Sequence, residues 1–228
     1  MRVSAIVLAA GRGRRLKSRL SKPLARINAK PILIYSLEVL SRQSGIREII
    51  VVANKNNLRA ITTLVKKYRI PKVAAVILGG SRRQDSVANG LKCLDKNTDL
   101  VLIHDAARPF IKRCLVSRLI KEAGRHGAAI AGVRVKSTIK QAGIRNFLVE
   151  KTVSRQGLWE IQTPEVFRRD LILEAYRRFG SQDVTDDAML VEKLRGSKVK
   201  IVEGSCRNIK ITTPEDLRIA AAICKVKI

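Results

Sequence analysis

The sequence predicts a three-layer α/β fold in which helices cover both faces of a mostly parallel, doubly wound sheet. Short, continuous apolar segments alternate with longer segments of helical periodicity, which is the pattern of parallel strands buried on both faces. The chain has 228 residues, of which 46% are hydrophobic. This is enough for one α/β domain with a full core, so we expect a single domain over residues 1–228 and no disordered chain.

Six strands are expected, at Val3–Leu8, Glu48–Ala53, Val73–Leu78, Leu100–His104, Ala128–Val133 and Lys198–Val202. Helices are expected at Pro31–Arg42, Asn56–Tyr68, Gln84–Leu94, Lys112–Arg125, Arg168–Arg178 and Pro214–Cys224. In the last helix, Thr213 is the expected N-cap and Pro214 the first residue. Because ligands of doubly wound sheets bind beyond the carboxyl ends of the strands, we expect functional residues directly after strands.

The segment Arg134–Val153 departs from this alternation, because it contains two extended runs around Ala142-Gly143 and few apolar residues that could join a core. The pattern predicts a protruding β-hairpin arm. Such an arm is either an ordinary surface excursion or a contact with a second subunit. We favour the second alternative and expect a homodimer.

The charge is strongly positive, with 46 Lys and Arg against 19 Asp and Glu, a net charge of +27. Basic residues attract anions, but here they are scattered, and only 4% of residues are aromatic. We therefore expect a solvated basic surface and no nucleic-acid partner. The four cysteines lie far apart, which favours a reduced, cytoplasmic protein without a zinc site. No apolar segment approaches the roughly 18–20 residues that span a bilayer, so no membrane contact is expected.

A glycine-containing turn with many basic residues follows the first strand, in the run LAAGRGRRLKSRLSKPL. It lacks the third glycine of a dinucleotide-binding turn, and Ala53-Asn54 stand where such enzymes carry an acid after the second strand. It also lacks the Gly-Lys-Ser/Thr of a Walker loop. Two interpretations remain: a mobile basic loop, or a cradle for a triphosphate in which Arg15 and Lys22 supply cations.

Two further motifs follow strands. In GGSRRQDSV, Gly79 and Gly80 would let a flat base lie against the backbone, with Arg83 and Ser86 at its edge. In VLIHDAARPF, Asp105 is placed to hold Mg²⁺ beside a triphosphate, and Arg108 to contact that carboxylate or a phosphate. His104 should face away from Asp105, because alternate strand residues face opposite sides, and we expect a packed or hydrogen-bonded histidine.

An ordered set of motifs resembles the 2-C-methyl-D-erythritol 4-phosphate cytidylyltransferase family of the non-mevalonate isoprenoid pathway. The motifs are LAAGRGRRL…SKPL, GGSRRQDSV, HDAARPF, KSTIK, TVSRQGLWEIQTPEVF, VTDDAMLVE and NIKITTPEDL, from Val3 to about Ala222. The resemblance implies a Rossmann-like nucleotidyltransferase domain whose arm interlocks a homodimer. It also implies that CTP reacts with methylerythritol phosphate, with Mg²⁺, and that pyrophosphate is released. The attacking phosphate oxygen is already ionised, so no general base is needed.

The resemblance also implies roles for residues. Arg15 matches a phosphate-binding arginine, Lys22 the lysine that stabilises the α-phosphorus, and Arg155 and Lys210 the pair that positions the substrate phosphate. The remaining matches are backbone of Ala9, Ala10, Gly11, Gly79 and Gly80 with Arg83 and Ser86 for the nucleotide, and Asp105, Arg108, Thr138 and Thr163 for the substrate side, with Asp105 near the metal.

Four positions depart from the family pattern: Pro23 after the lysine, Ser81 after the glycine pair, Ser137 before the arm threonine and Ser154 before the arm arginine. The position of Ser81 is often acidic in relatives, and the difference bears on a ribose contact. These changes bear on the substrate more than on the reaction class. The alternatives are a cytidylyltransferase for another polyol phosphate, such as ribitol 5-phosphate, and, more remotely, a non-enzymatic nucleic-acid-binding protein.

Overall fold

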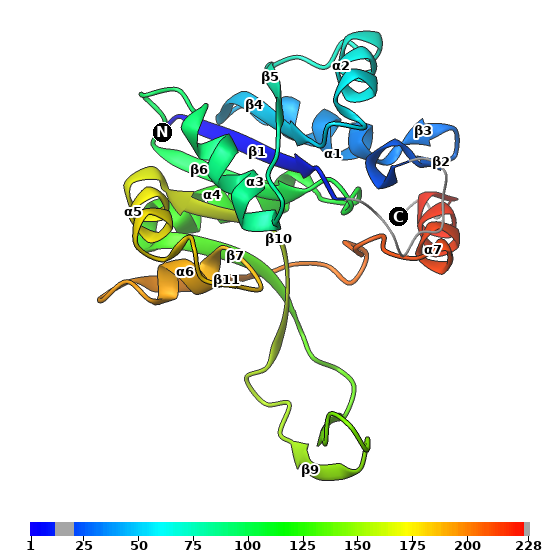
Figure 1. Ribbon diagram of the computed structural model, residues 1–228, viewed down its shortest axis with the longest axis vertical. Coiled ribbons are helices and arrows are strands. Elements are labelled where there is room, and N and C mark those ends of the chain that lie inside the picture. Colours follow the sequence, from blue (N-terminus) through cyan, green and yellow to red (C-terminus); the bar gives the residue numbers. More distant parts are fainter. Residues whose placement is uncertain (12–20, 226–228) are drawn as a thin grey trace.

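The central element of the fold is a seven-stranded sheet, seen in a computed structural model that describes residues 1–11 and 21–225 (Figure 1). Its strands are β1 (Val3–Ala9), β4 (Ile46–Ala53), β5 (Val73–Leu78), β6 (Leu100–Asp105), β7 (Gly127–Arg134), β10 (Trp159–Arg168) and β11 (Lys198–Glu203). They lie in the order β11-β7-β10-β6-β1-β4-β5. All neighbouring pairs are parallel except those of β10, which is antiparallel to β6 and β7. The predicted mostly parallel sheet is confirmed.

Helices cover both faces of this sheet, as predicted. They are α1 (Ile32–Ser41), α2 (Leu58–Lys67), α3 (Arg83–Lys92), α4 (Arg113–His126), α5 (Arg169–Phe179), α6 (Ala188–Glu192) and α7 (Pro214–Lys225). One core cluster joins α1, α2 and α4 to the sheet, and a second joins α3, α5 and α6 to the other face. Strand β1 supplies both clusters: Ala5 and Val7 enter the first and Ile6 the second, since successive side chains of a strand point to opposite faces. None of the helices in the described part of the chain has the length and apolar character that a membrane crossing requires.

Strand β10 was not expected from the sequence. It contains Pro164, and proline within a run counts against a central strand because it cannot donate to the ladder. The structure accommodates it with a register shift between Gln162 and Glu165 in the pairing with β7. The short helix α6 was also not expected. The other predicted elements are present with ends shifted by a few residues, and Thr213 Oγ1 accepts the Asp216 N–H at 3.3 Å, as expected of an N-cap.

A small third cluster lies beside the sheet, where α7 packs near the short strands β2 (Arg26–Ile27) and β3 (Lys30–Pro31) (Figure 1). Its buried members come from both ends of the chain: Ala25, Ile27, Ile32, Ile211 and Ala220. The 3₁₀ turn η2 (Lys22–Leu24) immediately precedes this cluster in the sequence.

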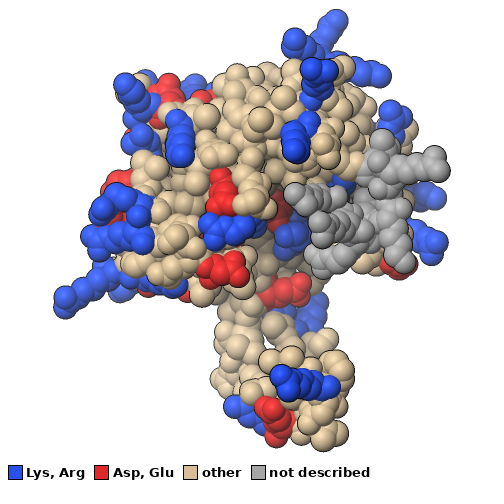
Figure 2. Space-filling view, in the orientation of Figure 1, with Lys and Arg blue, Asp and Glu red and all other residues tan. Residues whose placement is uncertain are grey.

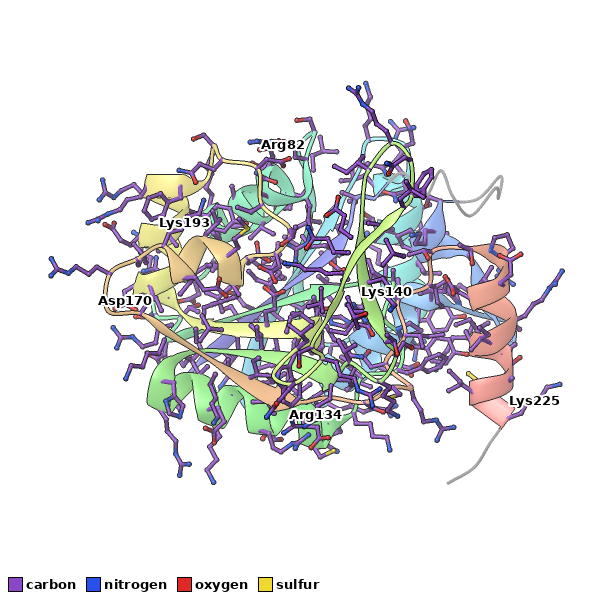
Figure 3. All side chains as sticks on the ribbon, turned by 90° about the horizontal axis from the view of Figure 1, so that it is seen from below. Arg82, Arg134, Lys140, Asp170, Lys193 and Lys225 are labelled. Atoms are coloured by element: carbon purple, nitrogen blue, oxygen red, sulfur yellow. The ribbon has the colours of Figure 1, made fainter. Side chains whose placement is uncertain are left out.

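The segment between β7 and β10 extends away from the body of the molecule (Figure 1). It contains the two-stranded antiparallel sheet of β8 (Ile139–Ala142) and β9 (Val149–Val153). The paired strands are shorter than the extended runs in the sequence, because Arg134 ends β7 and the turn covers residues 143–148. Lys140 Nζ donates to Thr152 Oγ1 across the pair at 2.6 Å, and Arg134 stacks on Trp159 at the base, 4.7 Å from the ring centre (Figure 3).

Candidate active site

A cavity of about 1070 Å³ lies at the carboxyl ends of β1, β4, β5 and β6. Most of the predicted site residues in the described part of the chain line it: Ala9, Ala10, Gly11, Lys22, Gly79, Gly80, Arg83, Ser86, Asp105 and Lys210. Arg15 lies outside the described residues. Ala10, Gly11, Gly79 and Gly80 directly follow strands and Asp105 ends β6, whereas Lys22 and Lys210 reach the same cavity from segments at opposite ends of the chain.

Asp105 is the acidic centre of this cavity. Its Oδ2 lies 2.6 Å from Lys210 Nζ and its Oδ1 lies 3.6 Å from Arg83 Nε. Burial raises the pKa of the Asp105 carboxyl, but the charges of Arg83 and Lys210 outweigh burial and hold the pKa well below its usual range. Asp105 is therefore ionised and holds two cations beside the cavity.

His104 faces away from the cavity and fixes the backbone beneath Asp105. The Thr163 hydroxyl accepts the Asp105 N–H at 3.0 Å and lies 3.0 Å from His104 Nδ1. Because Arg108 O can only accept, Nε2 carries the proton of the neutral ring and donates toward Arg108 O and Ser36 Oγ, and Nδ1 therefore accepts the Thr163 hydroxyl. Burial lowers the pKa of His104 to about 4. The prediction of a packed, hydrogen-bonded histidine is confirmed, and Thr163 supports Asp105 from below.

Arg83 links the cavity to a buried acidic cluster that the sequence did not reveal. Its Nη1 lies 2.8 Å from Asp187 Oδ2, and Asp187 Oδ1 accepts the Tyr176 hydroxyl at 2.5 Å. Burial, followed by the charge of Asp187, raises the pKa of the nearby Glu165 carboxyl well above its usual range. Arg83 thus has fixed partners on two sides, Asp187 at the start of α6 and Asp105 on β6. Asp187 lies in the run VTDDAM, but its contact with Arg83 depends on the tertiary fold.

The glycine pair after β5 is required by close packing against the start of α3. A Cβ on Gly79 would lie 2.5 Å from Ser86 Oγ, and one on Gly80 would lie 2.3 Å from Asp85 Cβ. Ser86 Oγ accepts the Gly80 N–H and donates to Arg82 O, each at 3.2 Å. The Ser81 hydroxyl donates to Asp85 at 2.8 Å. Ser86 thus fixes the backbone of this turn.

Four predicted substrate-side residues lie outside the cavity lining: Thr163, which is buried between His104 and the Asp105 backbone, Thr138, Arg155 and Arg108. Thr138 and Arg155 are exposed on the arm, where Arg155 donates to Lys136 O. The Arg108 guanidinium donates to the main-chain carbonyls of Asn208 at 2.8 Å and Ile161 at 3.3 Å, so it connects β10 to the segment that carries Lys210.

The doubly wound sheet, the glycine-containing turns and the cations around Asp105 define an α/β nucleotidyltransferase. The family profile of IspD, 2-C-methyl-D-erythritol 4-phosphate cytidylyltransferase, matches residues 3–226. The chain belongs to this family.

Individual relatives agree with this assignment. The enzyme of this name from Geobacillus kaustophilus is 44% identical over 225 residues, 98% of this chain and 97% of the relative. A crystal structure of 4-diphosphocytidyl-2C-methyl-D-erythritol synthase from Anaerococcus prevotii superposes with a TM-score of 0.87 at 35% identity, covering 99% of this chain and 96% of that one. The cytidylyltransferase structure from Thermus thermophilus gives a TM-score of 0.78 at 33% identity, covering 99% and 100%.

Proposed function

We propose that this protein transfers the cytidylyl group of CTP to 2-C-methyl-D-erythritol 4-phosphate and releases pyrophosphate, in the biosynthesis of isoprenoid precursors. The observation that carries this proposal is the cavity itself, which Lys22 lines together with Asp105 and the two cations next to that carboxylate, Lys210 and Arg83, in a chain of this family. Fixed cations suit phosphoryl transfer because negative charge is spread over the non-bridging oxygens of the reacting phosphate in the transition state.

In this mechanism an ionised phosphate oxygen of the polyol phosphate attacks the α-phosphorus of CTP. A new P–O bond forms, the bond to the β-phosphate oxygen breaks, and pyrophosphate leaves. Lys22 and Arg15 stabilise the triphosphate, while Lys210, held by Asp105, positions the attacking phosphate. His104 takes no part as a base, because it is buried, neutral and hydrogen-bonded to Thr163.

A divalent cation, Mg²⁺ in the first instance, fits this site mainly through the substrate. In the described part of the chain no three His, Cys, Asp or Glu side chains gather as a metal site. Asp105 can offer an oxygen, since its Oδ1 lies 3.6 Å from Arg83, and Mg²⁺ commonly binds one or two carboxylates together with substrate phosphates. The ion would neutralise triphosphate charge.

We further propose a cytoplasmic homodimer, with one nucleotidyltransferase domain per chain and the arm at about residues 134–153 as the contact. Thr138 and Arg155 are expected to hold the substrate phosphate, yet neither lines the cavity of its own chain. A second copy would bring them to it. Exposed apolar side chains at the arm tip and the start of β9 support an interface: Ile144, Phe147, Leu148 and Val149.

A substrate panel tests the central proposal. CTP is incubated with Mg²⁺ and, in turn, 2-C-methyl-D-erythritol 4-phosphate or ribitol 5-phosphate, and pyrophosphate release is followed. The proposal expects kcat/KM to be highest with methylerythritol phosphate. Preference for ribitol 5-phosphate would change the substrate and keep the reaction class. Turnover with neither substrate, together with tight, salt-sensitive DNA binding, would contradict both the substrate and the reaction class.

Figure 2 shows Lys and Arg distributed over this face of the body and on the arm, without one continuous band.

A further inference from the structure

We propose that Asn54 and Asn57, in the loop between β4 and α2, are positioning residues. They orient the turn after β1 that would bind the nucleotide, and they hold Ser21, the residue before Lys22. The proposal rests on the proposed function and names residues that neither the motifs nor the family resemblance singled out for a role. Both asparagines line the cavity, and both direct their amide groups to main-chain or hydroxyl groups of other elements.

Asn57 connects the two ends of the segment between β1 and η2. Its Nδ2 donates to Ala9 O at 3.1 Å and to Ser21 Oγ at 3.2 Å, and its Oδ1 accepts the Asn54 N–H at 2.9 Å. Both polar atoms of the side chain, Nδ2 and Oδ1, are thus hydrogen-bonded, and the residue is only 1% exposed. The partners fix the orientation of the amide, because a carbonyl can only accept and a backbone N–H can only donate. Ser21 directly precedes Lys22, so one buried amide relates the position of that lysine to the end of β1.

Asn54 acts on the next peptide of the same turn. Its Nδ2 donates to Ala10 O at 3.0 Å, and its Oδ1 accepts the N–H groups of Asn56 at 2.9 Å and Asn57 at 3.1 Å. The side chain therefore fixes the loop between β4 and α2, and it also bonds the turn after β1 through Ala10 O. An aspartate at this position could accept the same two N–H groups but could not donate to Ala10 O.

These two bonds determine where the amides of the turn point. In a planar trans peptide the C=O and the following N–H point in opposite directions. With the carbonyls of Ala9 and Ala10 held by Asn57 and Asn54, the N–H groups of Ala10 and Gly11 are turned away from the asparagines. Backbone N–H groups in such a turn are the donors that bind phosphate oxygens. The asparagine pair therefore presets the donors of the CTP side of the site.

The test uses near-isosteric variants of the full-length protein. In Asn57→Asp and Asn54→Asp the acceptor bonds are kept and the donor bonds to Ala9 O and Ala10 O are lost. The matched control is Asn56→Asp, which adds the same charge at an exposed residue that lines the same cavity and whose side chain makes none of the bonds above. Initial rates of pyrophosphate release are measured with each substrate varied, at low salt and at about 0.3 M salt, where exposed charges are screened.

We expect the KM for CTP to rise about tenfold in Asn57→Asp, and by less in the more exposed Asn54→Asp, because a buried carbonyl loses its donor. The KM for the polyol phosphate should stay at its wild-type value, and the increase should persist at the higher salt. An equal rise of the KM for CTP in Asn56→Asp would show that the added charge alone causes the effect, and it would overturn the proposal. Equal rises of the KM for both substrates in the Asn57→Asp and Asn54→Asp variants, or an unchanged KM for CTP in them, would overturn it as well.

Melting temperatures identify a variant that fails to fold. In that case Ser21→Ala, which removes only the hydroxyl contact, and Asn54→Asp decide the matter, and wild-type KM values for CTP in both refute the inference. An inactive wild-type enzyme would be a failure of the proposed function, whereas an active wild type with unaffected asparagine variants would be a failure of this inference alone.

Discussion

Lys210 Nζ lies 2.6 Å from Asp105 Oδ2, and this ion pair joins the segment before α7 to the end of β6. Arg83 approaches the other carboxylate oxygen of Asp105, so one acid orients two cations that come from separate elements. Asp105 thus holds Lys210 and Arg83 on the two oxygens of one carboxylate.

Asp105→Asn should keep the shape of the side chain and remove the charge that holds Lys210 and Arg83. We expect kcat/KM for the polyol phosphate to fall roughly 10- to 100-fold, because charge-assisted bonds of this kind contribute about 1.5–3 kcal/mol. Initial rates at saturating CTP check this, with the exposed Asp183→Asn as the control. An unchanged kcat/KM for the polyol phosphate in Asp105→Asn would show that the ion pair with Lys210 makes no contribution to the reaction.

Lys22→Ala should lower kcat by roughly 10²–10³-fold, as expected for loss of one preorganised group that stabilises the transition state. The KM for CTP should change much less. Single-turnover rates measure the chemical step directly, and Lys92→Ala on the exposed face of α3 is the matched lysine control. Near wild-type turnover would rule out this role for Lys22.

Arg155→Ala should raise the KM for the polyol phosphate, with or without a loss of kcat, because this arginine is assigned to the substrate phosphate. Arg145→Ala, also exposed on the arm, is the control. A change confined to the KM for CTP would show that the assignment is wrong. Mixing Arg155→Ala with Lys22→Ala should restore part of the activity if each arm serves the site of the other chain.

His104 should make the protein less stable as the pH falls. Its pKa is lowered by burial from 6.5 to about 4, so below 6.5 the unfolded chain binds a proton that the folded protein does not. Between pH 7 and pH 5 the linked loss in the free energy of unfolding is roughly 2 kcal/mol. Urea unfolding at about pH 7 and about pH 5 measures it. The difference in unfolding free energy between wild type and His104→Gln should narrow toward the lower pH; a constant difference would contradict the assignment.

Removal of the arm tip, residues 143–148, should weaken dimerisation, because it removes exposed apolar side chains that include Phe147, which is 81% exposed. The variant should keep the melting temperature of the wild type, since no residue of the tip belongs to any of the three core clusters. Light scattering across a dilution series measures the mass. An unchanged mass at the lowest concentration would refute the arm as the dimer contact.

The sequence predicted those parts of the molecule that depend on local pattern. Apolar strands followed by polar residues located Gly79, Gly80 and Asp105 at strand ends, and alternation along β6 placed His104 on the opposite side from Asp105. Lys210 came only from the family resemblance, because nothing near it in the sequence marks it as a partner of Asp105.

The parts that the sequence did not predict depend on contacts between distant segments. Strand β10 was hidden by Pro164, whose effect on the ladder is absorbed by a register shift. Arg108 was expected to contact a carboxylate or a phosphate, but the fold brings the carbonyls of Asn208 and Ile161 within its reach. Asn57 and Asp187 are unremarkable polar residues until their partners, Ala9 and Arg83, are placed beside them.

The small cluster beneath α7 has a consequence for biosynthesis. Ala25 and Ile27, soon after Lys22, pack with Ile211 and Ala220, on either side of the start of α7. Translation delivers the first pair long before the second, so we expect this cluster to close only after α7 has been synthesised. The segments that follow Lys22 and Lys210 should therefore reach their final packing later than the strands β1, β4 and β6.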